Sequence, residues 1–384
     1  MGRGAYARQN GPVSYLDHAA STPVRAEAVA AMLPFLTERY GNPSGAHAMA
    51  RDARNALDDA RVILADALGC KPGEIVFTSG GTEADNAAVF SYTGRGAVVC
   101  SAIEHHAVLD PVHRVGGRVV GVRSSGVVDL DALRAALDES VALVSIMLAN
   151  NEVGTIQPLS EVAEIVRAHA PQAVLHTDAV QAFPWLDVAA LAEPADLVSI
   201  SAHKFGGPKG VGVLVVRDGV DFEARQIGGG QERERRSGTQ NVAGIVAMAE
   251  AARLTVDERK AVIDRVTPMR DRLADGLLQS VPGTVESADR ARKVAGNCHL
   301  CFEGIESEAL LFLLEKHDVM ASAAASCASG AQDPSHVLAA LGVPRDVAQG
   351  SLRLSLGVST TDEDVDLALA VIPPAVARLR ERGS

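Results

Sequence analysis

Aromatic residues and basic residues are both scarce in this chain of 384 residues. Phe, Trp and Tyr together make up 3%, and 36 Lys and Arg stand against 48 Asp and Glu, which leaves a net charge of −12. Single-stranded nucleic acids are bound by aromatic stacking in positively charged grooves, and anionic membranes are bound by basic surfaces. We therefore expect no direct contact with nucleic acid and no membrane binding.

Long apolar runs are absent as well. The best one, residues 141–148, has the length of a strand and falls short of the roughly 20 residues that cross a bilayer as a helix. The N-terminal segment carries positive charge without the apolar stretch of a signal peptide. The few cysteines are odd in number and scattered, unlike a disulfide framework: Cys70, Cys100, Cys298, Cys301 and Cys327. We expect a reduced, cytoplasmic protein.

The chain is instead rich enough in apolar residues to build a large core. Hydrophobic residues make up 47% and charged residues 22%, close to the average of globular proteins. Strand-like runs alternate with helical patterns, which indicates βα units and a mostly parallel sheet in an α/β fold. The predicted strands are 74–78, 97–100, 141–148, 173–176, 196–200 and 211–216; the predicted helices begin near 82, at 159 and at 242.

The pattern changes near residue 260. Beyond it we expect helices at 261–278, 306–316 and 362–382 and strands at 294–302 and 351–357. We place a domain boundary there, with a large domain over 15–260 and a smaller α+β domain over 261–384 that also gathers residues 1–14. A Gly-rich, charged stretch, 228–241, precedes the helix at 242. Within it the basic run Arg233–Arg236 alternates with Glu232 and Glu234 and is expected to be a solvated loop.

Polar residues follow four of the predicted strands. These segments are 79–82, which opens a helix, and 150–152, 177–181 and 201–204. In an open parallel sheet, ligands bind at the carboxyl ends of the strands. We therefore expect an amide, a carboxylate, an amine and a helix N-terminus at one edge of the sheet.

These groups match the needs of one cofactor. The glycines before Thr82 offer a phosphate seat at a helix N-terminus, and Lys204 suits a desolvated amine that forms a Schiff base. Asp178 supplies a carboxylate for a pyridinium nitrogen, and His105 a flat imidazole. Each residue also has an ordinary structural interpretation, such as a helix cap or a solvated lysine. Taken together, they point to pyridoxal 5′-phosphate.

Motifs along the chain carry a family resemblance. They include Gly41-Asn-Pro-Ser44, Phe77-Thr-Ser-Gly-Gly-Thr-Glu83, Glu104-His105, Ser201-Ala-His-Lys204, Arg236-Ser-Gly-Thr239 and Ser351-Leu-Arg353. With these motifs the chain resembles cysteine desulfurases of the nitrogen-fixation and iron–sulfur-cluster type, within the class V aminotransferase group of fold-type-I pyridoxal phosphate enzymes. The resemblance covers all but the lead-in. It implies a mostly parallel seven-stranded sheet in the large domain.

The resemblance also implies roles for individual residues. Lys204 would bind the cofactor covalently and move a proton, Asp178 would pair with the ring nitrogen, and His105 would stack on the ring and act in acid/base chemistry. Thr239 would reach the phosphate in the neighbouring subunit's site, which implies a homodimer. Arg353, together with Asn151, would bind the substrate carboxylate. The remaining cofactor contacts would be Gly81, Thr82, Asn151, Gln181, Ser201 and His203.

Cys327 lies in a segment of small residues, 321–330, with almost no large apolar side chain to anchor it. Free cysteines are usually small buried hydrophobes, but this surrounding indicates a mobile loop with an exposed thiol. In the family such a thiolate takes the sulfur of L-cysteine as a persulfide and releases alanine. Ala324 stands where the family commonly has glycine, and the loop length matches the longer-loop subgroup.

Several alternatives remain open at this point. A class V aminotransferase or a selenocysteine lyase would use Lys204 but not Cys327, and a scaffold would bind the cofactor only to present a surface to a partner. The sulfur acceptor is expected to be a cluster scaffold protein, while DNA phosphorothioation and tRNA thiolation are the other branches. Cys298 and Cys301 have CxxC spacing, but residues three apart on a strand face opposite sides, which argues against a metal or redox pair.

Overall fold

The structure is a computed structural model that describes residues 7–8, 11–323 and 335–383. Its centre is a sheet of seven strands, in which β10 runs antiparallel to both of its neighbours and all other pairs are parallel. In spatial order these are β4 (Ile75–Thr78), β10 (Gly212–Val216), β9 (Leu197–Ser201), β8 (Val174–Asp178), β7 (Val141–Ser145), β5 (Ala97–Ser101) and β6 (Arg118–Val120). The expected mostly parallel seven-stranded sheet is confirmed.

Most strands of the large sheet match the sequence-based boundaries to within two residues, and β7 and β6 depart further. β7 ends at Ser145, and the apolar residues beyond it continue beside β8 through single hydrogen bonds from the Ile146 and Leu148 amides. β6 has no counterpart among the predicted strands. It is three residues long and lies at the sheet edge, where only Val120 is buried. A strand this short shows no periodic pattern of burial.

Helices cover both faces of this sheet, because successive strand residues point to opposite sides. On β4, Ile75 and Phe77 belong to one hydrophobic cluster and Val76 belongs to another. The first cluster also takes residues from α1 (Ala26–Thr37), α2 (Ala48–Leu68), α5 (Leu130–Ala136), α6 (Leu159–His169), α7 (Val188–Leu191) and the start of α8 (Val242–Ser280). The second takes residues from α3 (Gly81–Phe90) and α4 (His106–Arg114). The result is a three-layer α/β arrangement.

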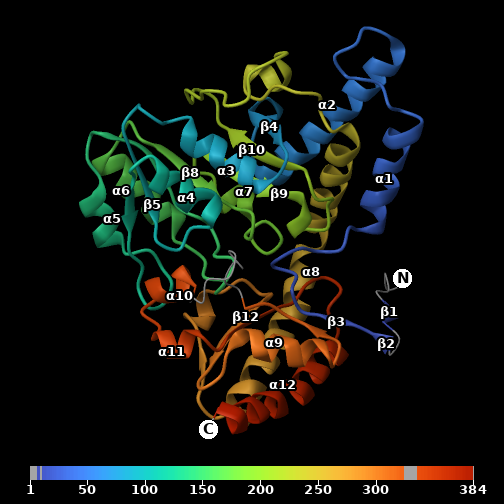
Figure 1. Cartoon of the computed structure of the whole chain (residues 1–384). Helices are drawn as coiled ribbons and strands as arrows, with labels where there is room; N and C mark the ends of the chain where they lie inside the picture. The colour runs from blue at the N-terminus through green and yellow to red at the C-terminus, as the bar shows by residue number, and fades with distance from the viewer. Residues whose placement is uncertain (1–6, 9–10, 324–334, 384) are drawn as a thin grey trace.

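A smaller antiparallel sheet lies below the large one in Figure 1. It contains β11 (Thr284–Glu286), β12 (Asn297–Phe302) and β14 (Ser351–Ser355). Its core is shared with α9 (Ser307–Glu315), α12 (Asp362–Gly383) and the later part of α8. The N-terminal β3 (Ser14–Tyr15) pairs with β13 (Val319–Met320), and Leu16 is buried in this core. The remaining elements are the pair β1 (Ala7–Arg8) and β2 (Gly11–Pro12), α10 (His336–Ala340) and α11 (Arg345–Ala348).

One long helix connects the two cores. The sequence predicts separate helices at 242–253 and 261–278, but α8 runs without a break over 39 residues. The intervening residues contain no Pro or Gly, so nothing in them stops a helix. The proposed boundary at 260 falls inside this helix, and the division into two domains stays a prediction. Although α8 is long, no helix in the described part of the chain is apolar enough to cross a membrane.

The CxxC cysteines of β12 point in opposite directions, as their spacing predicts. Cys298 packs into the core of the small sheet, whereas Cys301 packs with Ile103, Met147 and Leu338 in a separate cluster. Burial raises the pKa of the Cys298 thiol to about 12. Both thiols are therefore protonated, packed side chains at neutral pH.

Candidate active site

Lys204 stands at the end of a short 3-10 turn (Ala202–Lys204) that follows β9 directly. Its Nζ donates hydrogen bonds to the carbonyl oxygens of Ala19, at 2.6 Å, and Ala20, at 3.0 Å. Burial lowers the pKa of Lys204 to about 8, helped by the charge of Arg353 and opposed by that of Asp178. A substantial fraction of this amine is therefore neutral and nucleophilic near physiological pH.

Asp178 is the last residue of β8, the strand next to β9. Its Oδ1 accepts a hydrogen bond of 2.8 Å from the Val180 amide. Burial raises the pKa of Asp178 to about 6, while that hydrogen bond and the charge of Lys204 act in the opposite direction. Above this pH the side chain is a desolvated carboxylate. Such a group stabilises a protonated ring nitrogen placed beside it.

His105 follows β5 and caps the N-terminus of α4. Its Nδ1 accepts a hydrogen bond of 3.1 Å from the Ala107 amide, so the neutral ring carries its proton on Nε2. Burial lowers the pKa of His105 to about 4, with a contribution from the charge of Lys204. At neutral pH the ring is an uncharged, flat surface that lies close enough to Lys204 to sense its charge.

The start of α3 forms an open cradle. No side chain caps this helix, and Gly80 before it has φ 148° and ψ −176°, a conformation that glycine adopts readily. A Cβ atom on Gly81 would stand 2.9 Å from Val180 Cγ2 and 3.5 Å from Ser201 Cβ. Thr82 is exposed in the first turn. Uncapped amides at a helix N-terminus bind anions such as phosphate.

Three further predicted residues lie around Lys204. Gln181 Nε2 donates to the Ala19 carbonyl oxygen at 2.7 Å, the same oxygen that Lys204 contacts. His203 lies in the same turn as Lys204, with its Nδ1 3.3 Å from Ser21 Oγ, and burial lowers its pKa to about 4. Asn151 contributes its backbone oxygen, which accepts from Arg353.

Arg353 enters the site from the other sheet, in the middle of β14. Its Nη1 donates to the Asn151 carbonyl oxygen and its Nη2 to Asp17 Oδ1, both at 2.8 Å. Its Nε is buried with no hydrogen-bond partner among the described residues. The charge of Arg353 also helps to lower the pKa of Lys204. A guanidinium in this position can bind a carboxylate.

Thr239 is exposed in the loop before α8. This loop is not simply solvated, which corrects the expectation for its basic run Arg233–Arg236. Glu232 is buried in an ion pair of 3.0 Å with Arg61, and Arg236 pairs with Glu83 of α3 at 2.7 Å. The second pair holds the loop beside the start of α3.

A buried polar layer beside Asp178 was missed by the sequence reasoning. The His176 ring lies between Ser145 Oγ, 2.8 Å from Nδ1, and Ser199 Oγ, 3.0 Å from Nε2. Asp85 Oδ1 is 3.6 Å from His176 Nε2, and burial together with the charge of Asp178 raises the pKa of Asp85. The available signal was a histidine and an aspartate at positions where the strand and helix patterns require apolar residues.

Glu104 belongs to the same buried layer. Its Oε1 accepts from Ser101 Oγ at 2.6 Å and from the Met147 amide at 2.9 Å. Burial raises the pKa of Glu104 to about 8, and the charge of Asp178 adds to this effect. Glu104 is therefore mostly protonated at neutral pH, so a negative charge on Asp178 meets no second full charge there.

Cys327 lies outside the described residues, but the chain on either side of it is held at the site. Ser322 forms both backbone hydrogen bonds of a bridge with Arg353, and Ser351 Oγ donates to the Ala323 carbonyl oxygen at 3.0 Å. On the other side, Ser335 Oγ donates to the Glu152 carboxylate, and His336 Nε2 is 3.0 Å from the Glu104 carbonyl oxygen.

These groups fit pyridoxal 5′-phosphate. The chain offers an amine with a lowered pKa, a buried carboxylate, a neutral imidazole and an uncapped helix start, at or after the ends of four strands of one sheet. That combination defines the class of pyridoxal phosphate enzymes of the aminotransferase type. The chain belongs to the class V aminotransferase family, whose model matches residues 14–368.

Relatives within this family narrow the activity. The chain is 44% identical to the cysteine desulfurase IscS of Methanosarcina thermophila over 376 residues, which covers 95% of this chain and 92% of the relative. It is 43% identical to an IscS-like cysteine desulfurase of Mycobacterium tuberculosis, over 96% of this chain and 97% of the relative. The family is pyridoxal phosphate-dependent, and these relatives support pyridoxal phosphate-dependent cysteine desulfurase activity.

Solved structures agree with this assignment. A NifS-like protein superimposes with a TM-score of 0.88 at 37% identity, over 96% of this chain and 100% of the other. DndA from Streptomyces lividans superimposes with a TM-score of 0.75 at 36% identity, over 89% of this chain and 99% of the other. The expected fold class is therefore confirmed at the level of whole structures.

Proposed function

We propose that this enzyme converts L-cysteine to L-alanine and forms a persulfide on Cys327, from which the sulfur passes to an acceptor. The C–S bond of the substrate breaks as an S–S bond between the substrate sulfur and Cys327 Sγ forms. The substrate carbon that loses the sulfur takes up a proton, equal in number to the one that the Cys327 thiol gives up, and becomes the methyl group of alanine. The balance needs no oxidant. The observation that carries the proposal is the position of Arg353, which contacts the site of Lys204 and anchors the chain that leads into the Cys327 segment.

We assign the protein's own contributions as follows. Arg353 and Asn151 bind the substrate carboxylate, and Lys204 holds and moves the proton near the reacting carbon. Asp178 pairs with the nitrogen of the cofactor's pyridine ring, and His105 stacks on the face of this ring. Gln181 contacts the side of the ring that carries the phenolic oxygen. Pyridoxal phosphate, when bound, supplies the electron sink. The phosphate would be held by Gly81, Thr82, Ser201 and His203.

The reach of the chain supports Cys327 as the sulfur-accepting thiol. Cys327 is four residues from Ala323, which is held at the site, so it stands at most about 14 Å from there even in an extended chain. The other cysteines are less suitable, because burial raises the pKa of Cys70 to about 12 and keeps Cys298 in a core. A thiol must ionise to act as a nucleophile.

A homodimer is part of this proposal. Thr239 is exposed in the loop that Arg236 joins to Glu83 of α3, and in a dimer it would complete the phosphate site of the second subunit. Large apolar side chains also stand exposed on and after α1, among them Leu33 at 53%, Leu36 at 55% and Tyr40 at 69%. Contiguous exposed apolar residues are typical of a protein–protein interface. A second copy of the chain would cover them.

The acceptor and location are further parts of the proposal. An acceptor protein of iron–sulfur assembly is the first candidate, with DNA phosphorothioation as the second because DndA is among the similar structures. The net charge of −12 supports transfer through a protein rather than direct contact with nucleic acid. Unpaired thiols at Cys70, Cys100, Cys298 and Cys301 agree with a reducing, cytoplasmic location.

The first experiment measures alanine and sulfide from L-cysteine in the presence of a thiol reductant. We expect the wild-type holoenzyme to produce alanine and sulfide in equal amounts. Cys70→Ser serves as the matched control and should produce as much of both as the wild type does. Cys327→Ser should lose both products by at least about a hundredfold, because it lacks the nucleophile. Mass analysis of the unreduced enzyme should find one added sulfur atom on the peptide that contains Cys327.

Other outcomes identify the alternatives. Full activity in Cys327→Ser would contradict the persulfide mechanism and indicate a selenocysteine lyase or a class V aminotransferase. A keto acid in place of alanine would single out the aminotransferase. Unchanged sulfide release in Lys204→Ala would indicate that the bound cofactor takes no part in the reaction, as expected for a scaffold.

A further inference from the structure

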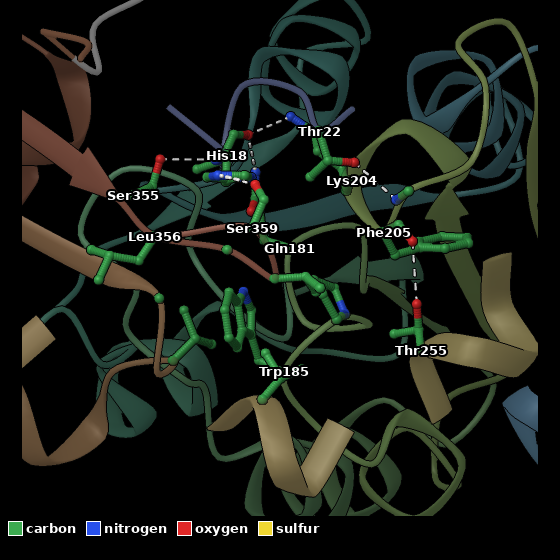
Figure 2. Close-up of a pocket in the computed structure, with 18 of the residues that line it drawn as sticks. His18, Thr22, Gln181, Trp185, Lys204, Phe205, Thr255, Ser355, Leu356 and Ser359 are labelled. Atoms are coloured by element: carbon green, nitrogen blue, oxygen red, sulfur yellow. Dashed lines mark hydrogen bonds between the residues drawn. The ribbon is translucent and has the colours of Figure 1, made fainter. Parts of the chain in front are cut away.

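A cavity of about 210 Å³ adjoins Lys204, and the glycines and Thr82 of the phosphate cradle do not line it. Its walls come from residues 18–25, from the segment after β8 that contains Trp185, from α8 and from residues 355–359 after β14. Figure 2 shows Lys204 and Gln181 on one side and Trp185 on another. Gly81, Thr82, His105, Asp178 and Arg353 do not line it.

The charged side chains of this cavity are all basic. Arg25, Lys204 and Arg259 line it, and none of the described lining residues is an Asp or a Glu. Arg25 already pairs with Glu258 at 2.7 Å, and Lys204 donates to backbone carbonyl oxygens. The cavity therefore has an excess of positive charge.

Of the three basic residues that line the cavity, Arg259 is the one with buried, unpaired hydrogen-bond donors among the described residues. Its Nε and Nη2 are buried and have no hydrogen-bond partner among the described residues. Its guanidinium lies 5.7 Å from the centre of the Phe183 ring. Burial lowers the pKa of Arg259, and the charge of Asp187, which does not line the cavity, acts in the opposite direction. Two buried donors without an acceptor are unfavourable on this half-buried side chain, and a carboxylate would satisfy both of them at once.

The rest of the wall is mostly apolar and suits a small hydrophobic body. Trp185, Phe205, Val262, Val294 and Leu356 contribute to it. Two side chains that are nine-tenths buried, His18 and Asn297, each line the cavity and have one nitrogen or oxygen without a partner. An empty cavity of about 150 Å³ is known to hold benzene. This larger cavity has room for one ring and a carboxylate group.

We propose that this cavity is a second ligand site, which binds a small organic acid with an apolar body. The carboxylate is held by Arg259, and the apolar body packs against Trp185. The occupant would also touch Lys204 and Gln181, so it would contact the active site without occupying the positions of substrate or cofactor. This inference goes beyond the proposed desulfurase function and does not depend on it.

The chain carries its own reporter for this site, because Trp185 is its one tryptophan. The experiment titrates the holoenzyme with phenylacetate and follows the fluorescence of Trp185. Phenylacetamide, which has the same shape without the charge, is the ligand control. We expect a saturable change with phenylacetate and affinity at least about tenfold weaker for the amide.

Variants test the role of Arg259. Arg259→Gln should weaken phenylacetate binding at least about tenfold, and Arg259→Lys should retain more of it because the charge remains. Arg253→Gln is the matched control on the same helix, since Arg253 is exposed and pairs with Glu250 and Asp257. It should bind as the wild type does. Melting temperatures confirm that each variant is folded.

Three results would overturn the proposal. They are an unchanged Trp185 signal at millimolar phenylacetate, equal binding of the amide, and full affinity in Arg259→Gln. Binding that disappears in Arg353→Gln but not in Arg259→Gln would place the acid at the substrate position instead. The titration needs no turnover, so its outcome is independent of whether sulfide is produced.

Discussion

The two sheets bring residues to the active site in different ways. On the large sheet, Lys204, Asp178 and His105 stand at or just after strand ends, where parallel hydrogen bonding fixes the backbone. On the small sheet, Arg353 lies in the middle of a fully buried strand and reaches across through its side chain. The position of its guanidinium depends on Asp17 and Asn151.

The large sheet and the small sheet therefore control different properties of the active site: the first the position of its groups, the second their charge environment. The strand ends determine where the cofactor groups lie, and a change of one side chain leaves the others in place. The small sheet supplies a charge that acts on the large one, because Arg353 helps to lower the pKa of Lys204. The small sheet therefore adjusts the reactivity of a residue that the large sheet positions.

Loss of the amine itself should have the largest effect. In the proposed mechanism Lys204→Ala removes the nucleophile for the cofactor and the proton carrier, so we expect sulfide release to fall by at least about a thousandfold. Lys209→Ala is the matched control, since Lys209 is exposed on the following turn. The melting temperature of the variant should stay near that of the wild type. Substantial turnover in Lys204→Ala would contradict the assigned role.

Loss of the guanidinium should have the next largest effect, and it should appear mainly in KM. Arg353→Gln should raise the KM for L-cysteine about a hundredfold, because the substrate carboxylate loses a paired, forked donor. The KM of Arg353→Lys should lie between those of the wild type and Arg353→Gln, because a lysine ammonium keeps the charge but not the forked pair of donors. Steady-state kinetics on both variants checks this. An unchanged KM would mean that the carboxylate binds elsewhere.

The coupling between the sheets predicts a pH dependence. The pKa of Lys204 is about 8, so the neutral amine declines about tenfold per unit below that pH. The rate at which the apoenzyme takes up pyridoxal phosphate should therefore rise with pH and level off above about 8. In Arg353→Gln, a positive neighbour is lost, the pKa of Lys204 rises, and the midpoint moves to higher pH. If the pH midpoint of cofactor uptake were the same in the wild type and in Arg353→Gln, the charge of Arg353 would have no effect on the pKa of Lys204.

The sequence was most informative where chemistry coincides with a change of pattern. Lys204 and Asp178 follow buried strands, so their convergence could be predicted from topology alone. Arg353 sits inside an apolar strand pattern, and only the family resemblance singled it out. Asp85 and His176 were missed, and Glu104 was named only as part of a family motif, because buried polar side chains are recognisable only once their partners are known.

The helix that joins the two cores was misjudged for a related reason. Charged residues between 253 and 261 look like a linker when the chain is scanned for apolar periodicity. In the structure this part of α8 is mostly exposed, so it needs no apolar stripe to remain helical. Its continuity depends on helix propensity and on the packing of both of its ends.

The continuous helix places a length constraint on the gene. An α-helix advances about 1.5 Å and turns about 100° with each residue, so one inserted or deleted codon in the exposed stretch of α8 would rotate everything beyond it. The apolar residues from Val266 to Leu277 would then leave their core, and β14 would carry Arg353 away from Lys204. Apart from Glu258, which pairs with Arg25, and Arg259, the identities of the exposed residues in this stretch can drift during evolution, whereas their number cannot.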